Sequence, residues 1–171
     1  MSEAIDRDDS PPRPGPEMEI KRLRANQSLS VTLLSALWGV WTHWNGRCSE
    51  PCYKDHKKCA GHRKGYPRRW KGYIHAIDHA SREEIFVELT PLACQCLLRQ
   101  LGSATRLRGQ VVRIKRLGGD RARLEVFVMP PHPEHLQLPK EKDPYPILAK
   151  LWGIADGEAL FGGSDDIPEN E

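Results

Sequence analysis

The sequence lacks the apolar segments that membrane and secreted proteins carry. No apolar run approaches the roughly 20 residues that a helix needs to cross a bilayer. Residues 1–17 are acidic and rich in proline, and they have no apolar core, which is unlike a secretory signal. We therefore expect a soluble intracellular protein of the cytoplasm, with the nucleoid or the nucleus as alternatives.

Catalytic motifs are also missing. The chain has no glycine loop for phosphates and no nucleophile motif, and the acidic residues between positions 78 and 88 show no paired spacing with histidine. Asp55, His56 and His62 lie close together in the sequence, which leaves a metal-dependent nuclease as an alternative. The sequence therefore predicts a protein that is not an enzyme.

Cysteine is scarce, and its pattern is that of a metal site. The chain has five cysteines, an odd number, and in a reducing compartment clustered thiols favour metal ligation over disulfides. The candidate ligands, with the spacing C-x3-C-x6-C-x2-H, are Cys48, Cys52, Cys59 and His62. Three thiolates and one imidazole suit tetrahedral zinc, and four protein ligands leave no open position for catalysis. We predict a structural zinc ion, with His43 or His56 as alternatives to His62.

Charge is strongly segregated along the chain. Residues 1–20 carry a net charge of −4, residues 21–130 carry +13, and residues 131–171 carry −6. The stretch Arg47–Lys71 alone holds nine basic and two acidic side chains. A basic body of this kind suits a polyanion, most often nucleic acid, and an ordinary solvated surface is the alternative.

Apolar alternation predicts a mainly β domain over residues 21–130. The segment 29–44 is apolar and ambiguous, but Gly39 and the β-branched Val40 and Thr42 favour a strand in its second half. Further strands are expected at residues 70–77, 85–89, 107–117 and 121–129.

One helix is expected between the third and fourth of these strands. Thr90 is a suitable N-cap, apolar residues then recur at helical spacing, and Gly102 ends the helix. On this helix we expect Cys94 and Cys96 to be small buried or half-buried thiols rather than ligands.

The resulting order of three strands, one helix and two strands resembles the OB fold, a small five-stranded barrel. The resemblance implies an OB-like barrel with the zinc loop, residues 45–71, inserted between its first and second strands. OB folds use that connection to grip their ligand, commonly an oligonucleotide, so the resemblance also implies binding of single strands. A small β-sandwich or another partly open barrel shares the element order.

Cations and aromatic rings are expected to share the binding surface. Single strands are bound in this way, because cations follow the phosphates and bases stack on rings. The predicted contact residues are Trp41, Lys57, Lys58, Arg63, Lys64, Arg68, Arg69, Lys71, Tyr73, Arg113, Lys115, Arg123 and Phe127. Trp38 and Trp44 are expected in the core instead. No base-reading helix is visible, so sequence-specific reading is not expected, and RNA remains an alternative to DNA.

The two ends of the chain are predicted to be acidic tails. Residues 1–20 are expected to be disordered, and residues 131–171 to form a linker, a short helix at 145–153 and a tail. Asp165–Pro168 resembles the acidic tail of bacterial single-strand-binding proteins, which implies recruitment of a protein partner. Such a tail can also compete for the basic surface. The short helix either docks a partner or packs on its own barrel.

These observations predict a non-enzymatic, zinc-stabilised protein that binds nucleic acid, with single-stranded DNA favoured. Replication, recombination or the life cycle of a mobile element would use such a protein. The alternative is a zinc-stapled adaptor whose basic face meets an acidic protein partner.

Overall fold

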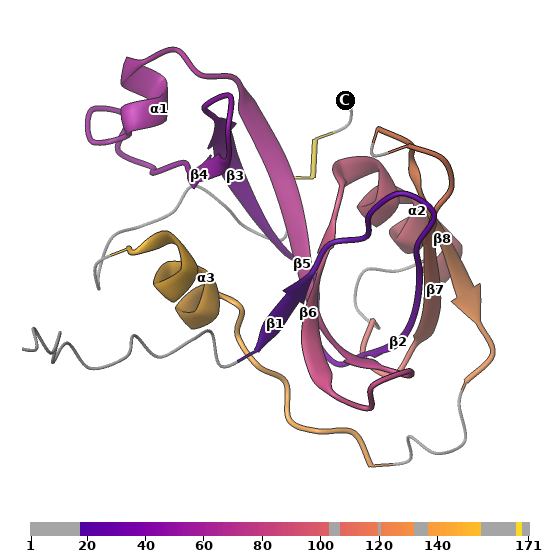
Figure 1. Ribbon diagram of the computed structural model, residues 1–171. Coiled ribbons are helices and arrows are strands. Elements are labelled where there is room, and N and C mark those ends of the chain that lie inside the picture. Colours follow the sequence, from indigo (N-terminus) through magenta and orange to yellow (C-terminus); the bar gives the residue numbers. More distant parts are fainter. Residues whose placement is uncertain (1–17, 103–106, 120, 132–136, 155–166, 169–171) are drawn as a thin grey trace, which may run out of the picture.

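The computed structural model describes residues 18–102, 107–119, 121–131, 137–154 and 167–168, and the described part is mainly β (Figure 1). The elements in these residues are β1 (Glu19–Lys21), β2 (Ser28–Leu33), β3 (Trp38–Trp44), β4 (Ser49–Pro51), α1 (Ala60–Arg63), β5 (Arg68–Asp78), β6 (Glu84–Leu89), α2 (Pro91–Leu101), β7 (Val111–Arg116), β8 (Leu124–Met129) and α3 (Tyr145–Trp152). None of the helices in the described ranges is both long and apolar enough to span a membrane.

The eight strands form one mixed sheet in the order β1-β6-β5-β2-β7-β8, with β3 also on β5 and β4 on β3. The long strand β5 organises it. One edge of β5 pairs with β3 at Arg68–Tyr73 and with β2 at Ala76–Asp78, and the other edge pairs with β6 at Gly72–Ile77. As a result β3, β4 and α1 stand together as a lobe at one end of β5 (Figure 1). We call residues 38–69 the metal lobe.

The predicted OB-like barrel is not confirmed, because the sheet is open. Closure would need the edge strands to pair, but β8 pairs only with β7 among the described residues, and the free edge of β6 is taken by β1. β1 joins β6 in parallel, with Ile20 opposite Phe86. Glu19 and Ile20 of this strand belong to the segment 1–20 that was expected to be disordered. They are ordered because Met18 and Ile20 are apolar and pack with Phe86 and Ile147.

Most of the expected elements are present. The strand in the second half of the ambiguous segment is β3, and the helix α2 has the expected caps: Thr90 Oγ1 accepts the Ala93 N–H at 3.3 Å, and Gly102 is left-handed with φ 66°. The strand β2 was not predicted as a separate element. Its sequence SLSVTL does alternate polar and apolar residues, so a period of two was present in the segment 29–44 that was treated as ambiguous.

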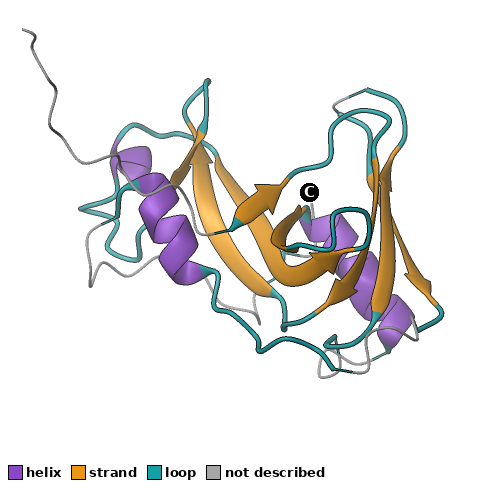
Figure 2. Cartoon of the chain, turned by 60° about the horizontal axis from the view of Figure 1, so that its bottom comes forward, coloured by secondary structure: helices purple, strands orange, loops and turns teal. Residues whose placement is uncertain are grey.

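The main core lies inside the curved sheet and is covered by α2. It includes the buried side chains of Val31, Leu33, Ile74, Ile85, Val87, Leu97, Val112 and Ile114. A second cluster joins Leu148 of α3 to Val40 and Tyr73 on the opposite face. The sheet is therefore covered on both sides, and Figure 2 shows the two longer helices on opposite sides of the strands.

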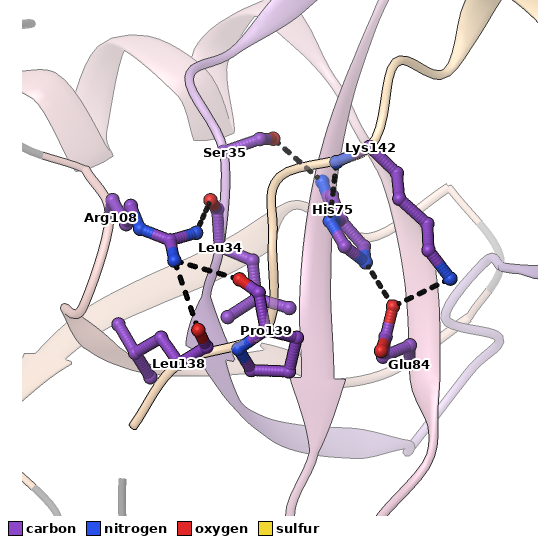
Figure 3. A network of polar contacts seen from close by, with 8 residues as sticks. All are labelled: Leu34, Ser35, His75, Glu84, Arg108, Leu138, Pro139 and Lys142. Atoms are coloured by element: carbon purple, nitrogen blue, oxygen red, sulfur yellow. Dashed lines mark hydrogen bonds and ion pairs between the residues drawn. The ribbon is translucent and has the colours of Figure 1, made fainter. Parts of the chain in front are cut away.

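The linker before α3 is fastened to the sheet by Arg108 (Figure 3). Its guanidinium donates to the Leu34 carbonyl at 2.7 Å, and to the carbonyls of Leu138 at 3.2 Å and Pro139 at 2.7 Å. One arginine from the loop before β7 thus joins the end of β2 to the linker.

A buried histidine provides the second fastening (Figure 3). His75 Nδ1 accepts the Lys142 backbone N–H at 3.1 Å, so its Nε2 carries the proton and donates to Glu84 at 3.0 Å. Burial holds the pKa of His75 below its ordinary value although Glu84 acts in the opposite direction, so the ring is neutral. Lys142 also pairs with Glu84 at 2.9 Å. This linker leads into α3, where Ile147 and Leu148 are buried against the sheet while Leu151 is 48% exposed.

Candidate metal centre and cationic lobe

Four potential ligand side chains meet at the base of the metal lobe. His43 comes from the end of β3, Cys52 follows β4, Cys59 is the N-cap of α1, and His62 lies within α1. Each offers one ligand atom, and these atoms all lie within 4.8 Å of one another. Cys52 and Cys59 are fully buried, and His43 is 1% exposed. This cluster could hold a metal ion, and we refer to it as the metal centre.

The metal centre shares three members with the predicted set. Cys52, Cys59 and His62 come together, but His43 completes the group in place of Cys48. The reason lies in the β3–β4 hairpin, whose last pair, Trp44 with Ser49, leaves Cys48 in the exposed turn. There its sulfur accepts from the Asn45 side chain at 3.4 Å.

His56, the other alternative ligand, lies next to the centre but outside the group of four. Its ring stacks on His62, with 3.9 Å between the centroids. The stack restrains the orientation of the His62 ring from the solvent side.

Close packing of α1 against β3 brings the two histidine ligands together. At Gly61 a Cβ atom would lie 2.2 Å from Cγ of His43, so only glycine fits at this position. The α1 turn is held by its own loop, because the Cys59 N–H donates to the Asp55 carbonyl at 3.1 Å. Cysteine and histidine ligands are therefore positioned by backbone contacts as well as by their own side chains.

Hydrogen bonding prepares His43 to act as a ligand. Its Nδ1 lies 3.0 Å from the Tyr66 carbonyl oxygen, which can only accept, so Nδ1 carries the proton. The lone pair is then on Nε2, which faces His62 Nδ1 at 3.3 Å. A backbone carbonyl that fixes the tautomer of a ligating histidine is a common outer contact of metal sites.

Burial changes the pKa values of two members of the metal centre. Burial, followed by the neighbouring Cys59, raises the pKa of Cys52 to about 12, and the opposing effect of Arg68 is smaller. Burial, followed by His56 and His43, lowers the pKa of His62. The imidazole is thus neutral, as a ligand must be, and the buried thiol gives up its proton only if a cation replaces it.

Six of the predicted contact residues are exposed on or beside the metal lobe. They are Lys57, Lys58, Arg63, Lys64, Arg68 and Arg69. Two of these cations lie over aromatic rings: the Arg68 guanidinium is 4.2 Å from the centroid of Trp41, and that of Arg69 is 5.3 Å from Trp44. Trp38, Trp41 and Trp44 are all half-buried, so the expected distinction between core and surface tryptophans is absent.

Two predicted contact residues do not face solvent. Tyr73 is fully buried, and its hydroxyl donates to Glu88 at 2.9 Å. Lys71 pairs with the same carboxylate at 3.1 Å, and only 16% of its side chain is exposed. The prediction was wrong for Tyr73 because α3 covers this face of β5, which the alternation of residues along β5 alone does not reveal.

The other four predicted contact residues lie on β7, on β8 and just before β8. Arg113, Arg123 and Phe127 are exposed, and Lys115 is half-buried with its ammonium 5.8 Å from the Phe127 ring. The predicted alternation of faces on these strands is confirmed. In the strand order β2 and β5 lie between this strip and the metal lobe.

The acidic tail is described only at Ile167 and Pro168, and Asp165 and Asp166 lie outside the described residues. Ile167 packs against the main core, and the Gln95 side-chain N–H donates to the Pro168 carbonyl at 2.6 Å. This part of the tail is therefore attached to α2.

Comparisons with protein families, with curated proteins and with solved structures found no match to this chain. Its function is therefore argued from the metal centre and the surface around it.

Proposed function

We propose that the chain is a zinc-stabilised, non-enzymatic protein that binds single-stranded nucleic acid, with DNA favoured. The observation that carries this proposal is the metal centre, because the lobe that holds it also carries exposed cations, two of which lie over half-buried tryptophan rings.

Zinc suits the ligand atoms, and two of their separations are close to those of a tetrahedral site. Tetrahedral bonds of about 2.0–2.1 Å to nitrogen and 2.3 Å to sulfur would set the two nitrogens about 3.3 Å apart and a nitrogen and a sulfur about 3.6 Å apart. The distance from His43 Nε2 to His62 Nδ1 is 3.3 Å, and that from His62 Nδ1 to Cys52 Sγ is 3.8 Å. Two thiolates and two imidazoles are a common structural zinc set.

The ion would be structural. Four protein ligands fill the tetrahedron, and three of the four residues are buried, so no position is left for water or substrate. The three tryptophans of the lobe are only half-buried, and small units without a fully buried core of their own depend on a metal for their fold. The ion would therefore hold the cations in place rather than act on a substrate.

The surface chemistry favours a phosphate backbone. Arginines stacked on Trp41 and Trp44 present planar guanidinium groups, which bind phosphate and stack on bases. The exposed Lys57 and Lys58 add two point charges on the same lobe. Such a surface binds without strong sequence preference, and its affinity depends on salt because phosphate contacts release counterions.

The test begins with the metal content of the purified full chain, where one zinc ion is expected. Cys59→Ser should lose the ion, whereas Cys48→Ser, which changes an exposed thiol outside the centre, should keep it. Loss of zinc in both variants would mean that the ligand set is wrong.

Binding is then measured by fluorescence anisotropy with single- and double-stranded oligonucleotides of equal length. We expect tighter binding of the single strand, and a loss of about tenfold or more between about 50 and 200 mM salt. Lys57→Gln with Lys58→Gln should weaken binding and leave the zinc content unchanged. Absence of binding at low salt would refute nucleic-acid binding, and an acidic polypeptide that co-purifies would favour an adaptor instead.

A further inference from the structure

A cleft of about 490 Å³ lies where β5 emerges from the sheet. Its walls come from four parts of the chain that are distant in sequence. They are Arg22 and Leu23 after β1, Arg68–Lys71 at the start of β5, Glu88–Pro91 at the junction of β6 and α2, and Arg116 with Leu124 on β7 and β8. We refer to it as the cationic cleft.

The charge of its lining is strongly positive. Five cations line it, namely Arg22, Arg68, Arg69, Lys71 and Arg116, and Glu88 is the one acidic residue among the lining residues. Glu88 is already engaged, because it accepts from Arg22 at 2.8 Å, from Lys71 at 3.1 Å and from the Tyr73 hydroxyl at 2.9 Å. The lining thus has a net charge of +4, which an anionic ligand would offset.

The start of β5 forms one wall of the cleft. Arg68–Lys71 pair with β3 on one edge, and β6 pairs with β5 only from Gly72 onward. Trp70 lines the cleft, is 2% exposed, and its indole N–H has no hydrogen-bond partner among the described residues. A Cβ atom at Gly39 of β3 would lie 2.7 Å from this indole nitrogen, so the nitrogen lies against β3, and the case for an anionic ligand rests on the positive lining.

Arg68 belongs both to the metal lobe and to the lining of the cationic cleft. The Arg68 guanidinium lies 4.2 Å from the Trp41 ring, which orients its flat face. A base can stack on such a plane while its phosphate contacts the cations deeper in the cleft. A volume of about 490 Å³ suits a nucleotide-sized group and is far too small for a duplex.

We infer that the cationic cleft binds phosphate groups of a single strand, one nucleotide at a time, beside Arg68 on Trp41. This inference rests on the proposed function and deepens it. It assigns binding roles to Arg22 and Arg116, which are distant from the metal lobe in sequence and were not predicted to bind.

The experiment compares two double variants that remove the same charge. Arg22→Gln with Arg116→Gln changes the cleft, and Arg99→Gln with Lys140→Gln changes exposed cations outside it. Binding of a labelled oligothymidylate to the full zinc-loaded chain is measured by anisotropy over a salt series. The cleft variant should lose about tenfold or more in affinity. The slope of log K against log[salt] should become shallower by about 1.4, which corresponds to two phosphate contacts on a single strand. The control variant should stay within about twofold of the wild type.

Arg116 also donates to the Ala122 carbonyl at 3.2 Å, so its replacement can disturb the β7–β8 hairpin. Arg22→Gln alone is therefore included, because the Arg22 side chain is 53% exposed and its loss leaves Lys71 on Glu88. Equal losses in the cleft and control variants, or no loss in Arg22→Gln, would overturn the cleft and leave the proposed function intact. A wild-type protein that binds no oligothymidylate at low salt would overturn both.

Discussion

Replacing Gly61 by alanine tests the metal centre with a single methyl group. By helix propensity alone the change should stabilise α1 by about 1 kcal/mol, since glycine is the poorer helix former. In the structure the new Cβ would lie 2.2 Å from Cγ of His43, against an ordinary contact of at least 3.4 Å. The helix and β3 must therefore separate by roughly 1.2 Å.

That displacement falls directly on the ligands. His62 follows Gly61 in α1, and its Nδ1 is 3.3 Å from Nε2 of His43. Metal–ligand distances tolerate about 0.2 Å, so a shift of roughly 1.2 Å removes one histidine from coordination. We expect Gly61→Ala to bind zinc about 100-fold more weakly. This is the upper end of the loss in metal affinity caused by removing an outer-shell contact of a metal site. This corresponds to about 2.7 kcal/mol less zinc-dependent stability.

The assay is competition for zinc with a chromophoric chelator at neutral pH, with thermal unfolding recorded with and without zinc. Gly119→Ala is the matched control, because its Cβ would meet nothing within 4 Å. It should bind zinc like the wild type. If Gly61→Ala also binds zinc with wild-type affinity, then His43 is not a ligand and α1 does not pack closely against β3.

Two further predictions concern the sheet and the tail. Burial disfavours the charge on Asp78, but hydrogen bonds from Lys21 and the Ala80 amide outweigh it and lower the pKa of Asp78. Asp78→Asn should thus lower the free energy of unfolding, measured in urea at pH 7, by about 2 kcal/mol. The difference between wild type and variant should shrink as pH falls below 3.8, the ordinary pKa of an aspartate. An unchanged difference at pH 3 would contradict the role of the Lys21–Asp78 ion pair. Ile167→Ala should detach the acidic tail from the main core. Residues 155–171 carry six acidic and no basic side chains, so we expect the affinity for an oligonucleotide to rise about threefold. An unchanged affinity would mean that the tail does not compete with the oligonucleotide for the basic surface.

Local chemistry was sufficient to predict much of the sheet. Alternation placed Val112 and Ile114 inward and Arg113 outward, and capping placed the ends of α2 at Thr90 and Gly102. Each of these features depends on neighbours a few residues away, so a single sequence contains the information.

The errors share a different cause. Cys48 was chosen as a ligand because it is near Cys52 in sequence, but in the hairpin it lies in the turn, and His43 reaches the centre through pairing with β5. Tyr73 is buried because α3 folds back on β5. Contacts of this range are set by tertiary packing, and spacing along the chain does not encode them.

The long strand β5 connects the metal centre to the cationic cleft. Its residues Arg68–Lys71 pair with β3, which also carries His43, while its later residues, such as Ile74 and Ala76, are buried in the main core. Since β6 supports β5 only from Gly72 onward, the segment that lines the cleft is held on one edge by β3 alone among the described residues. Metal binding therefore supports the cleft through one strand pair, and removal of zinc should loosen Arg68 and Arg69 before it disturbs the core. Under the proposed function the metal centre and the cationic cleft would act together, with a bound ion fixing the position of the cations at the start of β5 and the main core anchoring the rest of the strand.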